Sequence, residues 1–154
     1  MNKKNEKPDF ENSIGPWLGK TVKIVDYHLQ ELLNTHNIDL TKEQMIVLKR
    51  LHDRDGINQN ELAFLTLRNK SSLTRLLNKM QKKNYITREQ SQADKRVNHV
   101  YLTDLGKDTF KRTRPVIQQI ISTVQHNISK NEIDQIIMIL KKIQMNFNEN
   151  VQSL

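Results

Sequence analysis

Three helix-start signals follow one another in the middle of the chain, and their spacing limits this region to short helices in succession. Thr41 and Gln44 form a capping box, in which two side chains satisfy backbone amides that a helix start leaves free. Asn58 and Glu61 repeat the pattern, and Asn69 provides a third N-cap. The sequence therefore predicts three short helices that begin after residues 41, 58 and 69.

The third of these helices has two faces of opposite chemistry. Its apolar residues recur with the i, i+3, i+4, i+7 spacing of one buried face, namely Leu73, Leu76, Leu77 and Met80. Near the opposite pole of a helical wheel lie Ser71, Arg75, Asn78 and Lys82, flanked by Lys70, Ser72 and Lys79. Guanidinium and amide groups can read base edges in the major groove, and the flanking residues are placed for phosphates.

A β-hairpin is predicted directly after this helix. Strand-like runs cover 85–88 and 97–102, and the polar stretch 89–96 joins them. Lys95 and Arg96 lie near the tip, and an arginine there can enter a narrow A·T minor groove. Asp94 is predicted to organise the loop or the arginines around it. The alternative is that Arg96 pairs with Asp94 or Glu89 and only shapes the loop.

Positive charge is concentrated on the helix and the hairpin. From Arg68 to Arg96 there are nine Lys or Arg residues and two acids, so this segment carries +7 of the +8 formal charge of the chain. Such a field favours binding to duplex DNA. The alternative is that these side chains are simply solvated.

The terminal segments are predicted to be helices with apolar stripes. One covers 14–33, another begins at Thr103 with a bend at Pro115, and a third begins at the Ser129–Glu132 capping box. Three striped helices exceed what one small domain can cover, which favours a dimer over an intramolecular bundle. Residues 1–11 offer little to bury and are predicted to be a disordered tail.

Enzymatic and metal chemistry find little support in the sequence. There is no cysteine, the five histidines are scattered, and only four glycines occur, none in a phosphate-binding loop. We expect no cofactor and no catalytic or metal site; His28 and His36, which flank Glu31, are the only weak metal alternative. No apolar run is long enough to span a membrane. We expect a cytoplasmic protein without a membrane partner.

Six short motifs follow one another in the chain: Thr41–Gln44, Asn60–Ala63, Ser72–Leu77, Tyr85–Arg88, Asp94–Arg96 and Leu102–Gly106. Together they resemble the MarR family of winged helix-turn-helix transcriptional regulators. The similarity spans about residues 40–107 by motif and the whole chain by the order of the elements. Two departures are Asn84, where the family usually has Gly, and a wing tip at residues 90–92 without Gly or Pro. Asparagine also tolerates the left-handed conformation, so the third helix is predicted to end at Lys83 and Asn84.

The resemblance implies a mainly α fold with a small β-hairpin wing. A winged helix-turn-helix DNA-binding domain would cover 38–103, and the helical dimerisation region would cover 12–36 and 104–154. The predicted DNA contacts are Lys70, Ser71, Ser72, Thr74, Arg75, Asn78, Lys79 and Lys82 on the recognition helix and Arg88, Lys95 and Arg96 on the wing.

The function implied is that of a homodimeric repressor. It would bind a pseudo-palindromic operator on double-stranded DNA and be released by a small amphipathic or aromatic effector. Candidate effector-contacting residues are Trp17, Tyr27, His28 and Arg114. Two other functions stay open, a winged-helix adaptor that docks an acidic protein and a nucleoid-type protein that binds duplex DNA without sequence preference.

Overall fold

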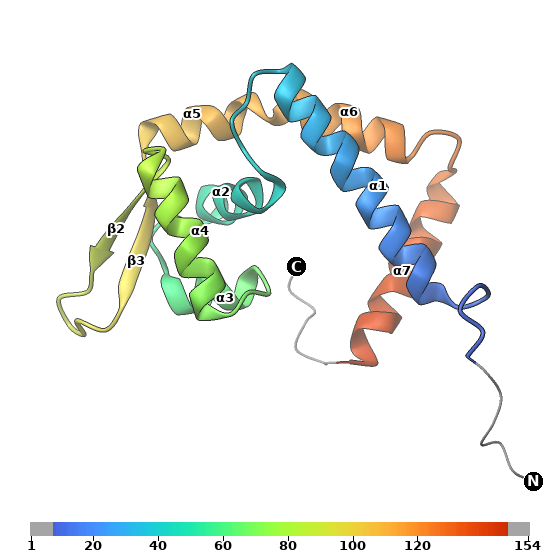
Figure 1. Cartoon of the computed structure of the whole chain (residues 1–154), viewed down its shortest axis with the longest axis horizontal. Coiled ribbons are helices and arrows are strands. Elements are labelled where there is room, and N and C mark those ends of the chain that lie inside the picture. The colour runs from blue at the N-terminus through green and yellow to red at the C-terminus, as the bar shows by residue number, and fades with distance from the viewer. Residues whose placement is uncertain (1–7, 148–154) are drawn as a thin grey trace, which may run out of the picture.

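The computed structural model describes residues 8–147, which form helices with a small sheet (Figure 1). The elements are α1 (Ile14–Thr35), α2 (Lys42–Asp53), β1 (Ile57–Asn58), α3 (Gln59–Leu65), α4 (Lys70–Lys82), β2 (Ile86–Gln90), β3 (Asn98–Leu102), α5 (Asp104–Arg112), α6 (Arg114–Val124) and α7 (Lys130–Met145). Residues 1–7 of the predicted disordered tail lie outside the described part. Its remaining residues contact the start of α1, where Trp17 Nε1 donates to the carbonyl of Glu11 at 3.0 Å.

The predicted helix starts are confirmed, with one change of detail. Capping boxes open α2 at Thr41 and α7 at Ser129, and the Asn69 side chain accepts from the amide of Ser72 at the start of α4. Asn58 caps α3 through the amide of Asn60, but the reciprocal bond from Glu61 is not formed. The expectation of a capping box there is wrong because Glu61 pairs with Arg54 instead.

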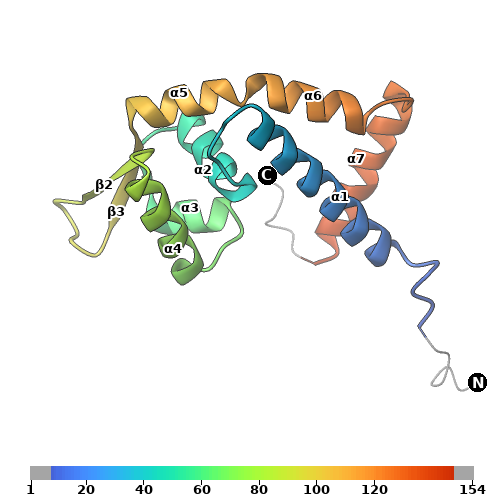
Figure 2. The same cartoon turned by 45° about the horizontal axis from the view of Figure 1, so that its top comes forward.

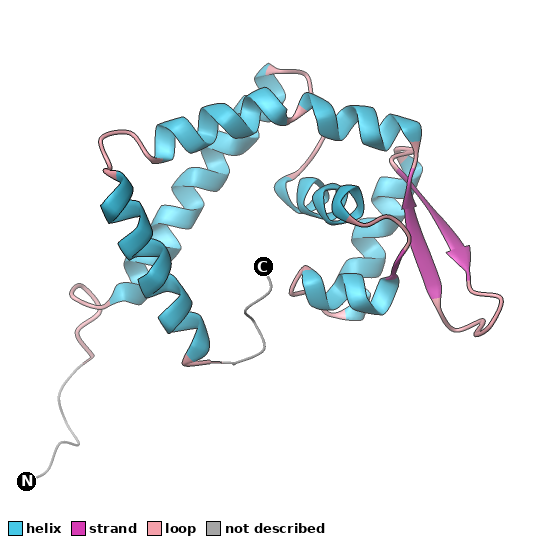
Figure 3. Ribbon diagram, turned by 180° about the vertical axis from the view of Figure 1, so that it is seen from behind, coloured by secondary structure: helices cyan, strands magenta, loops and turns pink. Residues whose placement is uncertain are grey.

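The three strands form one antiparallel sheet in the order β1-β3-β2. β2 and β3 make the hairpin, with Arg88 opposite Val100, and it projects from one end of the molecule (Figure 3). The first strand of the hairpin begins and ends later than predicted, which shortens the loop between the strands. β1, which the sequence did not indicate, pairs Ile57 with Val100.

α4 ends where predicted, at a residue in the left-handed conformation. Asn84 has φ 58°, and the amides of Asn84 and Tyr85 return to the carbonyls of Gln81 and Met80 at 3.0 Å each. Tyr85 then lies against α5, where a Cβ on Gly106 would stand 2.0 Å from the Tyr85 carbonyl oxygen. Only glycine fits this contact, which holds the start of α5 against the sheet.

The core lies inside the winged domain. Leu73, Leu77 and Met80 of α4 are fully buried together with Val47, Leu48 and Leu51 of α2, Leu62 of α3, and Val100 of β3. This confirms the predicted inner face of α4. The core continues to the C-terminal end of α1 through Leu29 and Leu33.

The helix predicted to bend at Pro115 is divided into α5 and α6. Thr113 ends the first and precedes the second, and Pro115 occupies the first turn of α6, where its missing amide costs no helical hydrogen bond. The two helices follow one another along one side of the molecule (Figure 2). Together they join the winged domain to the terminal helices.

α7 and the N-terminal part of α1 stand apart from the winged domain, as Figure 1 shows. α1 packs against α6, whereas α7 has no buried residue and forms no extensive packing with another element among residues 8–147. None of the helices in this part of the chain is long and apolar enough to cross a membrane.

Candidate nucleic-acid interface

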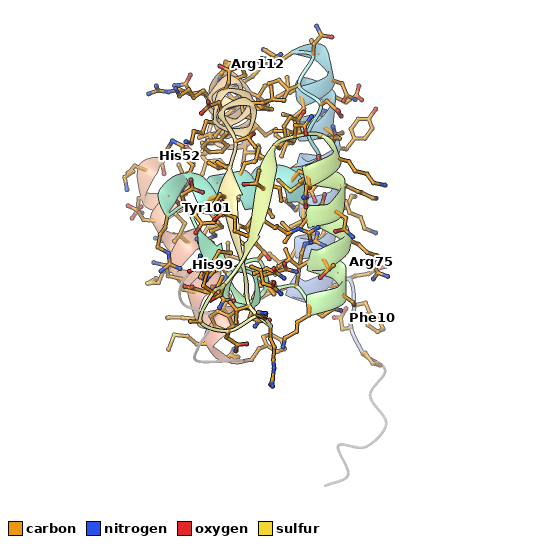
Figure 4. The ribbon with its side chains drawn as sticks, turned by 90° about the vertical axis from the view of Figure 1, so that its left-hand side faces the viewer. Phe10, His52, Arg75, His99, Tyr101 and Arg112 are labelled. Atoms are coloured by element: carbon orange, nitrogen blue, oxygen red, sulfur yellow. The ribbon has the colours of Figure 1, made fainter. Side chains whose placement is uncertain are left out.

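The outer face of α4 presents the polar side chains that the helical wheel placed there. Ser71, Arg75, Asn78 and Lys82 are exposed, and so are Lys70 and Lys79 beside them. Arg75 has no hydrogen bond or ion pair within the described structure, and it points away from the sheet (Figure 4). Its guanidinium is therefore available to a ligand without first breaking a protein contact.

A hollow of about 510 Å³ lies between the start of α2 and this face of α4. Its lining includes Glu43, Arg68, Arg75, Asn78 and Lys79. Three of these side chains are cationic and one is acidic, so the hollow favours an anion. Arg68 was not among the predicted contacts, although it lies at the edge of the basic segment of the sequence.

Four of the predicted contacts on α4 already have protein partners, namely Ser71, Ser72, Thr74 and Asn78. The Ser71 hydroxyl donates to Asn69 Oδ1 at 3.0 Å. The Ser72 hydroxyl accepts from Arg68 Nη1 at 2.8 Å. Thr74 is half-buried, accepts from Gln59 Nε2 at 3.0 Å and donates to the carbonyl of Lys70 at 2.8 Å. Thr74 therefore ties α3 to α4, a packing role that the sequence pattern did not distinguish from DNA contact.

The wing tip is organised by polar side chains in place of Gly or Pro. Asp94 Oδ1 accepts from the amide of Arg96 at 3.0 Å, and the Asp94 amide donates to the Ser91 hydroxyl at 3.3 Å. The carbonyl of Asp94 accepts from the amide of Val97 at 3.0 Å. Asp94 thus holds the loop backbone, and it forms no ion pair with an arginine in residues 8–147.

Lys95 and Arg96 are exposed at this tip. Neither forms an ion pair with Asp94, Glu89 or any other acid in the described part of the chain, so the internal pairing of Arg96 is not observed there. The side chain of Gln90 donates to the carbonyl of Lys95, which fixes the backbone beneath the two cations. The tip therefore offers two free positive charges on an ordered loop.

Arg88 differs from these two cations. It is half-buried on β2, and it donates from Nε to Gln81 Oε1 at 2.8 Å and from Nη2 to Asn78 Oδ1 at 2.6 Å. The structure thus turns this predicted wing contact toward α4. Sequence reasoning missed Gln81, which follows Asn78 by three residues and so lies beside it on the helix.

At the end of α4, a polar cluster neutralises one more cation of the basic segment, Lys83. Lys83 Nζ lies 2.7 Å from Asp39 Oδ1, and the Tyr85 hydroxyl donates to the Asp39 carbonyl at 3.0 Å. Burial of the phenol, together with the negative charge of Asp39, raises the pKa of Tyr85. The cluster fixes the α1–α2 connection to the start of the hairpin.

The four predicted effector-contacting residues do not line one hollow. Tyr27 and His28 line a hollow of about 620 Å³ on α1, together with Lys20 and Lys23. Trp17 lines a neighbouring hollow of about 380 Å³ with Phe10, and Arg114 lines neither of the two. In residues 8–147 no three His, Asp or Glu side chains are grouped to hold a metal ion, His28 and His36 included.

Comparison with known proteins supports the MarR resemblance. The sequence model of the MarR family matches residues 40–97, from the start of α2 to the end of the wing loop. The matched segment contains α4 and the wing, and thus both parts of the candidate interface. Helices α1, α6 and α7 lie outside it.

Solved structures of MarR-type regulators share the fold over most of the chain. The transcriptional repressor CouR, solved bound to a 23-mer DNA duplex, superposes with a TM-score of 0.81 at 20% identity, covering 91% of this chain and 99% of CouR. BpsR of Bordetella bronchiseptica gives 0.81 at 19% identity, covering 90% and 98%. Apo MarR from E. coli gives 0.69 at 24%, covering 90% and 98%. This chain therefore has the DNA-binding fold of MarR-family transcriptional regulators.

Proposed function

We propose that this chain, which has the MarR-type winged helix-turn-helix fold and matches the family model in residues 40–97, is a homodimeric, sequence-specific transcriptional repressor. The observation that carries the proposal is the outer face of α4. There an unpaired arginine and two lysines, Arg75, Lys79 and Lys82, stand exposed on a helix whose other face packs against the core. A rigid helix with such a face fits the major groove.

The wing supplies the second contact in this proposal. With α4 in the major groove, the hairpin that follows it reaches the adjacent part of the duplex, where Lys95 and Arg96 meet the minor groove or its phosphates. An arginine is attracted to a narrow A·T minor groove by its enhanced negative potential. The ordered loop beneath Arg96 lowers the entropy cost of placing that side chain.

Exposed apolar residues on the terminal helices support the homodimer. α1 exposes Val22 and Ile24, α6 exposes Ile121 and Val124, and α7 exposes an apolar run that begins at Ile136. Apolar surface of this extent is costly in water and marks an interaction site. A second copy of the chain supplies a matching surface through twofold symmetry, and it would place two α4 helices for a pseudo-palindromic operator.

The hollow on α1 supports release by a small effector. Lys20, Lys23 and His28 give it cationic or titratable groups beside the Tyr27 ring, a combination that suits an anionic aromatic molecule. In the structurally similar BpsR, DNA binding is regulated by 6-hydroxynicotinic acid, which is an aromatic acid. We infer an effector of that chemical class for this chain.

The test begins with selection of bound fragments from genomic DNA, which yields the operator. Affinity is then measured for Arg75→Ala, Lys79→Ala and Arg96→Ala on the operator, on a scrambled duplex and on an operator with G·C flanks. We expect Arg75→Ala to cost about 1–3 kcal/mol on the operator only. Arg96→Ala should weaken binding most where A·T-rich sequence flanks the half-site.

Lys79→Ala serves as the comparison, because it should lower the affinity for all three duplexes alike. The slope of log affinity against log salt concentration should also fall by about one for each phosphate that the variant no longer binds. Equal reductions in affinity on all duplexes for Arg75→Ala and Arg96→Ala would instead describe a non-specific duplex binder. If the protein binds no DNA but binds an acidic protein, it is a winged-helix adaptor instead.

A further inference from the structure

Arg88 contacts α4 because side chains alternate between the two faces of β2. Ile86 is buried against the core, and Arg88, two residues later, lies on the same face of the strand. That face is directed toward α4, the helix against which β2 packs. Arg88 therefore continues the core contact of Ile86 with a charged group at the edge of the sheet.

The guanidinium binds two neighbouring side chains of α4 at once. Nε donates to Gln81 Oε1 at 2.8 Å, and Nη2 donates to Asn78 Oδ1 at 2.6 Å. Hydrogen bonds from a charged donor are shorter and stronger than neutral ones, and the planar guanidinium fixes the directions of both. Asn78 is thus held by the wing strand although it lies on the exposed face of α4.

This contact decides which atoms of Asn78 are free. Since Oδ1 accepts from Arg88 on the wing side, Nδ2 is the atom left to face a groove. Asparagine recognises adenine through both atoms, with Oδ1 accepting from N6 and Nδ2 donating to N7. Arg88 occupies one of the two lone pairs of Oδ1 and fixes the plane of the amide, so position 78 presents mainly the Nδ2 donor. A single donor matches acceptors such as N7 of either purine, O6 of guanine and O4 of thymine, without the two-bond preference for adenine.

We propose that Arg88 is a positioning residue that sets the base preference of Asn78 by holding its amide oxygen. The proposal rests on the proposed function, because it assumes that α4 enters the major groove. Arg88 acts here through Asn78 and is not itself a contact to a base. It also links the wing to α4, so that the hairpin and the helix are presented to the duplex as one unit.

The first experiment compares base preference at each operator position for the wild type, Arg88→Lys and Asn78→Ala. Lysine keeps the charge but cannot bind Asn78 and Gln81 in the same planar geometry. We expect Arg88→Lys to raise the preference for adenine on the order of tenfold at the one position that Asn78→Ala alters, because the freed amide can bind adenine through both atoms. In an Asn78→Ala background, Arg88→Lys should leave that position unchanged.

The second experiment needs no DNA. The side-chain amide signal of Asn78 in a nitrogen-15 NMR spectrum, identified by its loss in Asn78→Ala, should shift in Arg88→Lys. The matched control is Arg54→Lys, the same exchange at an arginine that pairs with Glu61 away from Asn78, and it should leave the signal in place.

Four results would overturn the proposal, and only one of them would also overturn the proposed function. An Asn78 signal that does not respond to Arg88→Lys would show that the contact is absent in solution. If Arg88→Lys leaves the base preference unchanged, Arg88 has no part in recognition. If the variant lowers affinity equally on all sequences, Arg88 is a phosphate contact. Either result would leave the proposed regulator function intact. A wild type without any sequence preference would overturn the proposed function as well.

Discussion

At the scale of single residues, the close approach of Gly106 to Tyr85 gives a direct test of the fold. A Cβ at position 106 would meet a backbone oxygen, which cannot rotate away as a flexible side chain could. We expect Gly106→Ala to lower the free energy of unfolding by about 1–3 kcal/mol, the usual cost of overpacking. Chemical denaturation followed by circular dichroism measures this change.

The matched control is Gly15→Ala, in α1. A Cβ there meets nothing within 4 Å, and alanine has the higher helix propensity, so stability should stay level or rise by up to about 1 kcal/mol. Equal destabilisation of the two variants would contradict the close approach.

Two left-handed residues show what the sequence can reveal at this scale. Asn84 was predicted to end α4 because asparagine tolerates positive φ. Leu67, with φ 52°, ends α3 in the same hydrogen-bonding pattern, and its amide returns to the carbonyl of Phe64 at 3.1 Å. Leucine rarely adopts this conformation, so no property of the residue itself could indicate it. The short connection between α3 and α4 imposes it.

At the scale of elements, local signals predicted the helices because caps and apolar spacing act within a few residues. The start of α2 at Thr41 and the buried face of α4 around Leu73 are of this kind. β1 depends on a residue far along the chain, Val100. The partners of Arg88 are only 7 and 10 residues away, but they lie on another element. Whether a strand face meets α4 follows from the packing of the hairpin, which no local pattern encodes.

The capping box of α2 yields a prediction for this scale. The Thr41 hydroxyl accepts from the Gln44 amide at 3.3 Å, and the helix that it opens buries Val47, Leu48 and Leu51 completely. We expect Thr41→Ala to lower the free energy of unfolding by about 0.5–2 kcal/mol. Thr41→Ser keeps the hydroxyl and should remain close to the wild type in the same denaturant titration. An alanine variant as stable as the wild type would show that the cap contributes nothing.

At the scale of the whole molecule, α7 gives the clearest test of the proposed dimer. Ile136 is 48% exposed in the single chain and lies on a helix without any buried residue. In the proposed dimer we expect this position to be buried, so Ile136→Asp would bury an unpaired charge at a cost of several kcal/mol. We expect sedimentation equilibrium to show a dimer for the wild type and dissociated or unfolded chains for Ile136→Asp.

Asn131→Asp is the control for this variant, because it adds the same charge at the exposed start of α7, where a helix favours an acid. It should sediment as the wild type does. A folded wild-type monomer at micromolar concentration would contradict the obligate dimer.

The position of the candidate effector-contacting residues was the least predictable part of the molecule. Trp17 and Tyr27 share one helix but are ten residues apart, which is about 15 Å along its axis. The hollow that contains Tyr27 extends along α1 from Pro16 to His28, so distance along the helix does not exclude Trp17. The two side chains project about 80° apart around the helix axis, and the structure places them in separate hollows. Sequence spacing shows which side chains share a helix, whereas the elements packed around that helix decide where a hollow forms.

The connection at Thr113 links the orientation of the winged domain to that of the terminal helices in the proposed dimer. α5 is fixed to the winged domain at one end, and at the other Arg112 Nη2 donates to the carbonyl of Asn37 at 2.9 Å, just beyond α1. α6 continues from Thr113 to the terminal helices, so in the proposed dimer any change in the angle between α5 and α6 would move the winged domain as a rigid arm. Twofold symmetry would repeat the movement in the partner, and the separation of the two α4 helices would change by the sum of both movements. The half-site spacing that the proposed dimer could span would thus depend on the angle between α5 and α6.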